Sequence, residues 1–224
     1  MYGPLFKIEI FVIIFYRIEG DQFMAIPMDY NGGLTREQFL FHEARITAAL
    51  LCQQLPRENI LQKIREENLF QYPTERMVEG MVKVCFRRID ALNSPELTEA
   101  LAFGTVATAK QVNLYAMMKY NRVMWDFMVM TIGEKFRTRD LDFSKKDLNL
   151  FFYHLQEQND KVASWSDATV TKIKQVIQKS LVECEYLDST SSERLNPVLI
   201  AAELENGIRE NHDLAALPAF NCFY

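Results

Sequence analysis

Hydrophobic residues recur at helical spacing along most of the chain. The clearest stripe follows steps of three and four and predicts one buried helix face after a cap at Thr74. Its members are Met77, Val78, Met81, Val82, Cys85, Ile89 and Leu92. Asn93-Ser94-Pro95-Glu96 should end that helix and start a short one that stops near Gly104. The apolar segment from Val106 to Ile132 then predicts a long central helix.

Turn and capping residues predict the remaining helices. Asn31-Gly32-Gly33 indicates a turn, and Thr35 with Gln38 forms a capping-box pattern for a helix that runs to about Leu55. Pro56 suits the first turn of the next helix. Further helices are expected after Ser144, which starts another capping-box-like pattern, over 167–185 after Ser166, and from about Ala201 to Glu210. A short extended piece, Leu195 to Ile200, lies before the last of these.

These elements predict an all-α fold, a multi-helix bundle with a smaller C-terminal helical lobe. We expect the bundle over residues 30–133 and the lobe over 134–224, with the charged segment 134–144 as a basic loop and linker. The extended piece would add a short β element and make the lobe winged-helix-like. Only eight glycines and seven prolines are present, which disfavours an all-β fold rich in turns.

Residues 1–29 form an N-terminal extension with its own pattern. Ile8 to Ile18 reads IEIFVIIFYRI, whose β-branched and aromatic content suits a strand. Its uninterrupted apolar run has seven residues, whereas a membrane-spanning helix needs about 20, so we expect no membrane partner. The alternative is that the natural start is Met24 or Met28, and that residues 1–23 are a mis-called extension.

The four cysteines are far apart and form no CxxC pair, which is unlike a metal site or a dense disulfide framework. No secretory signal pattern is present, so we expect a reducing cytoplasm in which the thiols pack as small apolar groups. Common enzymatic motifs such as GxGxxG, HExxH and GxSxG are also missing. The three histidines lack ligand spacing. We therefore expect no catalytic residue, no cofactor and no metal, unless the fold assembles a site.

Charge is segregated along the chain, whose formal net charge is −5. Lys135 to Lys146 holds five basic residues against two aspartates, and Lys161 to Lys179 holds four lysines against Asp167. Any contact with nucleic acid must therefore come from a local patch, because a protein that coats phosphates usually has a large positive excess.

The predicted helix over 167–185 has two distinct faces. One is apolar and should be buried; it comprises Val170, Ile173, Val176, Ile177, Ser180, Leu181 and Cys184. The other carries Thr171, Lys172, Gln175, Gln178 and Lys179, with Lys174 at its edge. Lysine, glutamine and threonine donate to phosphate oxygens and base edges, so this face suits a nucleic acid. The alternative is an ordinary solvated face with a linker behind it.

Several short segments, taken in order, resemble a known family. They are Tyr30–Leu34, Glu43-Ala44, Glu67–Leu69, Thr74–Arg76, Phe86–Ile89, Trp165–Thr169, Lys172–Lys174, Leu181–Glu183, Tyr186-Leu187 and Arg194–Pro197. From about Tyr30 to Ile208 the chain resembles the BrxA family of bacterial phage-defence systems, most closely at Trp165–Thr169. Residues 1–23 fall outside the resemblance, which supports the mis-called start.

The resemblance implies membership of a BREX phage-exclusion system, in which host DNA is methylated as self and phage replication is blocked. It also implies a helical fold similar to that of the antitermination protein NusB, and nucleic-acid binding in place of catalysis. Other BREX proteins, such as a methyltransferase or an ATPase, would be partners.

We therefore expect a non-catalytic accessory protein that binds nucleic acid, with double-stranded DNA as the expected ligand. The residues expected to contact it are Lys161, Lys172, Lys174, Gln175, Lys179 and Arg194, extended by Lys135, Arg137, Arg139, Lys145 and Lys146. The alternative is a protein-interaction adaptor that docks within the defence complex and never touches DNA. Its acidic remainder would suit a basic partner surface.

Overall fold

The computed structural model describes residues 29–223. The predicted strand at 8–18 and the question of the natural start lie outside the described residues. Within the described residues the chain is helical, and its only β pairing is one isolated bridge between Asp142 and Arg194. The predicted all-α fold is confirmed. The expected short β element is reduced to that single bridge, and Leu195 to Ile200 forms no strand.

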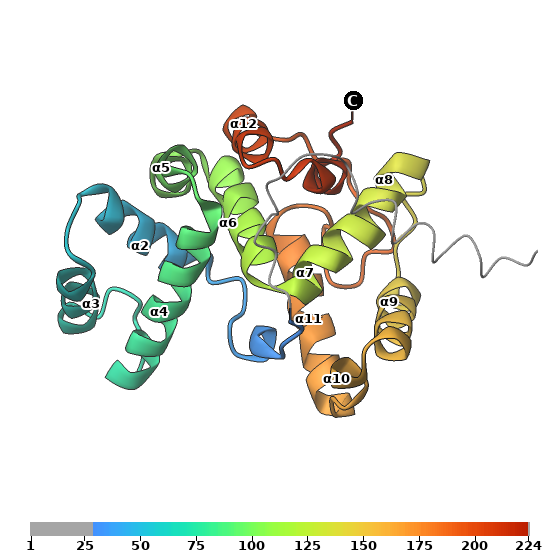
Figure 1. The fold of residues 1–224 in the computed structure, drawn as a ribbon, viewed down its shortest axis with the longest axis horizontal. Coiled ribbons are helices and arrows are strands. Elements are labelled where there is room, and N and C mark those ends of the chain that lie inside the picture. The colour runs from blue at the N-terminus through green and yellow to red at the C-terminus, as the bar shows by residue number, and fades with distance from the viewer. Residues whose placement is uncertain (1–28, 224) are drawn as a thin grey trace, which may run out of the picture.

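The N-terminal half of the described chain forms five α-helices that lie on one side of the molecule and in its middle (Figure 1). A short 3-10 helix, η1 (Gly33–Thr35), precedes them. The helices are α2 (Phe41–Cys52), α3 (Arg57–Glu66), α4 (Glu75–Leu92), α5 (Pro95–Phe103) and α6 (Val106–Tyr120).

The C-terminal half continues from the middle to the opposite side in Figure 1. Its elements are α7 (Arg122–Phe127), the π-helix η2 (Met128–Gly133), α8 (Glu134–Thr138), α9 (Lys145–Gln158), α10 (Asp160–Ala163), α11 (Asp167–Glu183), α12 (Ala202–Glu210) and the 3-10 helix η3 (Leu214–Phe220). The helices predicted from Ser144, Ser166 and Ala201 are all present. The expected basic loop after Gly133 begins only after Thr138, because its first five residues form α8.

Two hydrophobic clusters hold these helices together. The smaller one lies between α2, α3 and α4; its buried members are Leu50, Ile60, Ile64, Phe70, Val78, Val82 and Phe86. The larger one surrounds α6, in which every residue from Gln111 to Lys119 is buried, so the predicted central position of this segment is confirmed. Its members come from both sides of residue 134. The division into two domains at that point stays a prediction.

Local capping explains where several helices begin. The hydroxyl of Ser94 accepts a hydrogen bond from the backbone N–H of Leu97 at 3.1 Å, and Thr74 accepts one from Met77 at 3.4 Å. Ser144 and Asp147 form a reciprocal capping box at the start of α9. Each contact satisfies an N–H group that the first helical turn would otherwise leave unpaired.

The helix predicted from Thr35 starts six residues later, so that prediction was wrong. The hydroxyl of Thr35 donates to the carbonyl of Gly32 at 2.9 Å and caps no helix. Leu40 precedes α2 in a left-handed conformation with φ of 50°. The buried Arg88 guanidinium and the Asn113 amide, at 3.2 and 2.7 Å, both donate to the carbonyl of Phe39 and hold this segment in place.

The single helix predicted from Val106 to Ile132 is interrupted, which corrects a second expectation. Asn121 leaves the helical conformation, with φ of −129° and ψ of 116°, and its side chain caps α7 by accepting from the N–H of Met124 at 3.3 Å. Gly133 does not end the segment either. A Cβ there would lie 3.2 Å from the backbone nitrogen of Ala219, so this glycine allows η3 to pack closely.

The C-terminal segment is fixed to the central helix by a buried ion pair. The ammonium of Lys119 lies 2.6 Å from Oδ2 of Asp213, and both side chains are almost fully buried. The hydroxyl of Tyr115 donates to the same carboxylate oxygen. These contacts join residues more than 90 positions apart and close the core over α6.

Candidate nucleic-acid interface

Helix α11 is positioned by its cap and its apolar face. The hydroxyl of Ser166 accepts a hydrogen bond from the N–H of Thr169 at 3.3 Å and fixes the first turn. All seven residues predicted for the inner face are buried, from Val170 to Cys184. The helix ends at Glu183, two residues before the predicted end. The polar face is therefore directed outward.

Two lysines and one glutamine remain available on this outer face. Gln175 and Lys179 are exposed, Lys172 is half-buried, and the three lie within about 60° of one another on a helix that turns 100° per residue. Among the described residues no carboxylate forms an ion pair with Lys172 or Lys179. We define Lys172, Gln175 and Lys179 as the α11 face. Its lysines are about 10 Å apart along the helix.

Lys174 has a different environment from the other lysines of α11. Its ammonium donates to the side-chain oxygen of Asn149 at 2.8 Å and lies 5.3 Å from the centre of the Phe152 ring. Burial lowers the pKa of Lys174, with Asp167 opposing the shift. Lys174 thus connects α11 to α9, and we leave it out of the α11 face.

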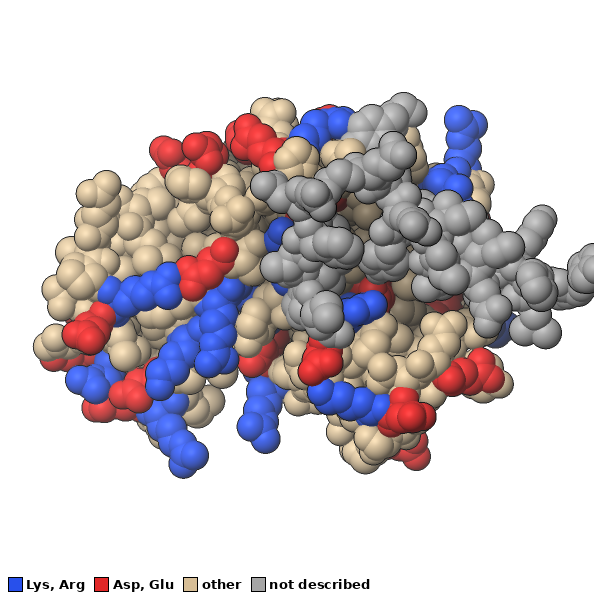
Figure 2. All heavy atoms as spheres, in the orientation of Figure 1, with Lys and Arg blue, Asp and Glu red and all other residues tan. Residues whose placement is uncertain are grey.

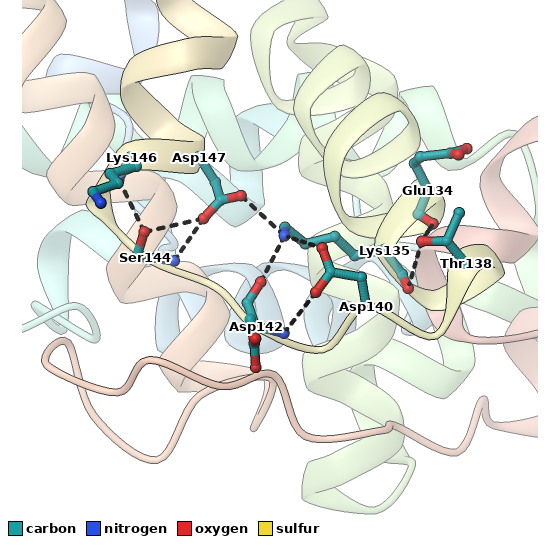
Figure 3. Close-up of polar contacts among 8 residues, drawn as sticks. All are labelled: Glu134, Lys135, Thr138, Asp140, Asp142, Ser144, Lys146 and Asp147. Carbon is teal, nitrogen blue, oxygen red and sulfur yellow. Dashed lines mark hydrogen bonds and ion pairs between the residues drawn. The ribbon is translucent and has the colours of Figure 1, made fainter.

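The basic segment between α8 and α9 is folded around Lys135 (Figure 3). The Lys135 ammonium donates to the carbonyl of Asp142 at 2.6 Å and lies 3.1 Å from Oδ2 of Asp140 and 2.9 Å from Oδ1 of Asp147. Its side chain is 12% exposed. We call this arrangement the Lys135 cluster. The three acceptors use the donors of this ammonium, so little of its charge is available to a ligand.

The pKa of Lys135 reflects both its burial and its partners. Burial lowers this pKa, but the hydrogen bonds and negative charges of Asp147 and Asp140 outweigh burial and leave the pKa above its ordinary value. The other oxygen of Asp147 accepts from the N–H of Ser144 at 2.7 Å. One carboxylate therefore both caps α9 and holds the turn that precedes it.

The other predicted basic residues of this segment point outward. Arg137 forms an ion pair with Glu134 on its own helix. Arg139, Lys145 and Lys146 are exposed, and among the described residues none of the three forms an ion pair. The predicted cluster of five cations thus contains three that a ligand can reach without displacing a carboxylate.

Arg194 and Lys161 lie outside α11, in two different environments. Leu195 donates its N–H to the carbonyl of Leu141 at 2.7 Å, and Phe143 donates to Glu193 at 2.9 Å. These bonds bring the exposed Arg194 beside the α8–α9 segment. Lys161, at α10, lies 3.9 Å from Asp29, which is itself highly exposed.

A further group of cations on α4 was not predicted. Arg76, Lys83 and Arg87 are exposed and follow steps of seven and four, so they share one face of the helix. That spacing is present in the sequence, on the side of the helix opposite the predicted buried stripe. The buried Arg88 beside them has a structural role instead, as described above.

Residues that could support catalysis are scattered. His42 and His154 lie on α2 and α9, and His212 follows α12. Among residues 29–223, no group of three or more His, Cys, Asp or Glu side chains is arranged to hold a metal ion. Burial raises the pKa of the Cys85 thiol to about 12, so this cysteine is not a reactive thiolate.

Comparison with known proteins decides the family. The family model described as BrxA matches residues 28–212. This chain belongs to the BrxA family. A relative named "BREX protein BrxA" from Bacillus cereus (strain H3081.97) is 30% identical over 165 residues, which cover 74% of this chain and 82% of the relative. A second protein of that name, from Paramagnetospirillum magneticum, is 24% identical and covers 85% of this chain and 94% of its own length.

A solved structure supports the fold of this BrxA family member. The crystal structure of an uncharacterized protein from Magnetospirillum magneticum aligns with a TM-score of 0.72 at 22% identity, over 85% of this chain and 97% of the other. The family and the names of the relatives support a component of a BREX phage-defence system. No helix in the described part of this chain has both the length and the apolar content to span a membrane.

Proposed function

We propose that this BrxA family member is a non-catalytic accessory protein that binds nucleic acid within a BREX phage-defence system, with double-stranded DNA as its ligand. The α11 face carries the proposal, because it presents Lys172 and Lys179 without carboxylate partners among the described residues, and Gln175 between them. Lysine ammonium groups neutralise phosphates, and a glutamine amide donates to phosphate oxygens or base edges.

Additional cations fit the same ligand. Arg139, Lys145 and Lys146 belong to the segment that connects α8 and α9 and begins α9, Arg194 lies beside this segment, and Lys161 lies at α10. A chain with net charge −5 attracts a polyanion only where such residues gather. We therefore expect binding that depends steeply on salt, because each phosphate contact releases a bound counterion.

Fluorescence anisotropy with labelled duplex DNA, single-stranded DNA and RNA across a salt series tests this function. Saturable binding to the duplex, with log affinity falling linearly in log salt, is the expected result. Replacing two lysines of the α11 face, Lys172→Gln with Lys179→Gln, should reduce the magnitude of the salt slope by roughly two. No binding of any nucleic acid at low salt would contradict the proposal.

A matched control separates local contacts from global charge. Ala202→Glu with Asn206→Asp lowers the net charge by two, as the α11 double variant does, on exposed positions of α12. This control should bind DNA with nearly the affinity and salt slope of the unmodified protein. Equal losses in both double variants would mean that net charge alone governs binding.

The second candidate is an adaptor that docks on a methyltransferase or ATPase of the defence system. A shallow hollow on α9 favours it, because its lining includes Leu150 and Tyr153, each 57% exposed. Leu150 and Tyr153 are three residues apart and therefore lie on one face of α9, where both can contact the same partner. Leu150→Ser with Tyr153→Ser should then abolish co-purification with the partner and leave DNA affinity unchanged; retained co-purification would reject this surface.

A further inference from the structure

Helix α4 carries a linear row of cations on its outer side. Arg76, Lys83 and Arg87 fall within about 40° of one another around the helix axis and span about 16 Å along it. All three are exposed, and none comes from the segments that the sequence marked as basic. In the space-filling view, Lys and Arg side chains gather over the part of the molecule where α4 lies (Figures 1 and 2).

The three carboxylates of α4 pair with two arginines of the neighbouring helix α3. Arg65 lies 3.2 Å from Oε1 of Glu79 and 3.9 Å from Oε2 of Glu75. Arg57 donates to Oδ2 of Asp90 at 3.1 Å. Because α3 supplies these arginines, the acids of α4 do not need its own cations as partners.

The three cations themselves remain available. Among the described residues, Arg76 and Lys83 form no ion pair, and the hydrogen bond made by Arg87 goes to the hydroxyl of Tyr120 at 3.5 Å. A phenol is neutral at physiological pH, so this hydrogen bond raises the pKa of Arg87 but does not cancel its charge. The carboxylate of Glu37 also interacts with Arg87 electrostatically and helps to raise this pKa. A row of exposed cations that forms no ion pair within 4 Å among the described residues is complementary to a polyanion.

Gly80 lies between Arg76 and Lys83, where the helix would be more stable with alanine. Glycine in a helix interior is less stable than alanine, and a Cβ at position 80 would meet nothing within 4 Å. Internal packing therefore does not require glycine here. The missing side chain leaves the helix backbone open to close approach from outside.

We propose that Arg76, Gly80, Lys83 and Arg87 form a second contact surface, the α4 face, which binds the phosphate backbone of nucleic acid without reading its sequence. This inference rests on the proposed function and adds a site that is separate from the α11 face. Guanidinium and ammonium groups at the α4 face provide only donors, which suits phosphates.

The spacing of the cations favours a nucleic-acid backbone over an acidic protein. Lys83 and Arg87 are about 6 Å apart along the helix, and Arg76 and Lys83 about 10 Å. Phosphates recur at a fixed interval along a nucleic-acid strand, so a row of cations can contact several of them in succession. Acidic side chains on a protein surface have no such fixed repeat.

The test uses variants of the full chain and the anisotropy assay described above. Lys83→Gln with Arg87→Gln changes net charge by the same amount as the α11 double variant and the α12 control. We expect the salt slope to fall by roughly two, and affinity to fall equally for duplexes of unrelated sequence. Thermal unfolding of each variant checks that the fold is intact.

Gly80→Ala supplies a second, charge-neutral variant. The added methyl group should raise the melting temperature, since alanine favours the helix, yet weaken DNA binding several-fold by holding the backbone away from the ligand. Higher stability with lower affinity cannot arise from partial unfolding. Unchanged affinity in both α4 variants would overturn the proposal.

The outcomes distinguish this inference from the proposed function. Binding lost in the α11 double variant but unchanged in both α4 variants rejects the α4 face alone. Binding lost in the α4 variants but unchanged in the α11 double variant supports the α4 face and rejects the α11 face. No binding by the unmodified protein rejects both.

A competition assay tests for an acidic protein as the ligand. A polyglutamate peptide that displaces DNA from the unmodified protein as well as unlabelled DNA of equal charge would assign the α4 face to acidic proteins and also overturn the proposal.

Discussion

The α8–α9 segment and the α4 face use charge in opposite ways. In the former, Lys135 contacts Asp140, Asp147 and the carbonyl of Asp142 (Figure 3). Its charge therefore stabilises the fold and is not available to a ligand. In the latter, two arginines of α3 pair with the three acids of α4, and the cations of α4 stay exposed. A count of charges along the sequence therefore overestimates the positive charge available at the α8–α9 segment and does not reveal the α4 face. What matters is which carboxylates lie within reach after folding.

Removing the centre of the Lys135 cluster should have the largest effect on stability. Lys135→Met leaves two neighbouring carboxylates and a carbonyl without their donor, and we expect unfolding free energy to fall by about 2 kcal/mol. For a chain of this length, that corresponds to a melting temperature lower by roughly 4–8 °C. Lys146→Met, on the exposed side, should change stability by no more than about 0.5 kcal/mol. Equal losses of unfolding free energy in the two variants, measured by calorimetry, would show that the contacts of Lys135 contribute no more to stability than those of Lys146.

Alkaline pH should remove part of the same contribution. The folded-state pKa of Lys135 lies above its ordinary value of 10.5, so its stabilisation is complete below that pH and declines as pH rises through the higher folded value. The difference in unfolding free energy between the unmodified protein and Lys135→Met should stay constant from about pH 7 to pH 9 and shrink above about 10.5. Urea titrations of both proteins at these pH values measure this difference in unfolding free energy. A difference that widens with pH would contradict the assigned charge.

Releasing the acids of α4 should weaken DNA binding modestly. Arg65→Gln leaves Glu75 and Glu79 unpaired beside the α4 face, and repulsion from phosphates should lower affinity about two- to threefold at low salt. Above about 0.5 M salt the difference should disappear, because exposed charges are then screened. Arg209→Gln, which removes an arginine paired with Glu205 on α12, is the charge-matched control. An equal loss of DNA affinity in Arg209→Gln would mean that the effect of Arg65→Gln does not depend on the acids of α4.

The smallest expected effect concerns the first turn of α9. Lys145 places a positive charge at the positive end of this helix dipole, so Lys145→Gln should raise unfolding free energy by about 0.3 kcal/mol. Lys145→Arg keeps the charge and should leave stability unchanged. Precise thermal melts at low ionic strength resolve the two. A loss of stability in the glutamine variant would mean that Lys145 has a structural partner, like Lys135.

The sequence predicted those features of the fold that are local. The helix starts after Thr74, Ser94, Ser144 and Ser166 were predictable because the capping hydroxyl and the backbone N–H that donates to it lie within four residues. The same pattern at Thr35 failed because contacts with Arg88 and Asn113, at least 49 positions away, fix the backbone before α2. No local rule contains such a contact.

The candidate site was predictable to a similar degree. The two faces of α11 followed from helical periodicity, so the outward position of Lys172, Gln175 and Lys179 could be predicted. The fate of Lys174 and Lys135 could not, since each depends on a partner from another element. The α4 face required knowledge that α3 neutralises Glu79 and Asp90.

The ion pair between Lys119 and Asp213 also bears on how the chain is synthesised. The central helix carries a buried ammonium group whose counter-ion follows 94 residues later, so the core around α6 cannot close while the C-terminal segment is still within the ribosome. Nascent chains that end before Asp213 would contain an unpaired charge at their centre. The core around α6 therefore reaches its final packing only after the C-terminal segment has been synthesised. We expect prematurely terminated chains to be more sensitive to proteolysis than the complete chain.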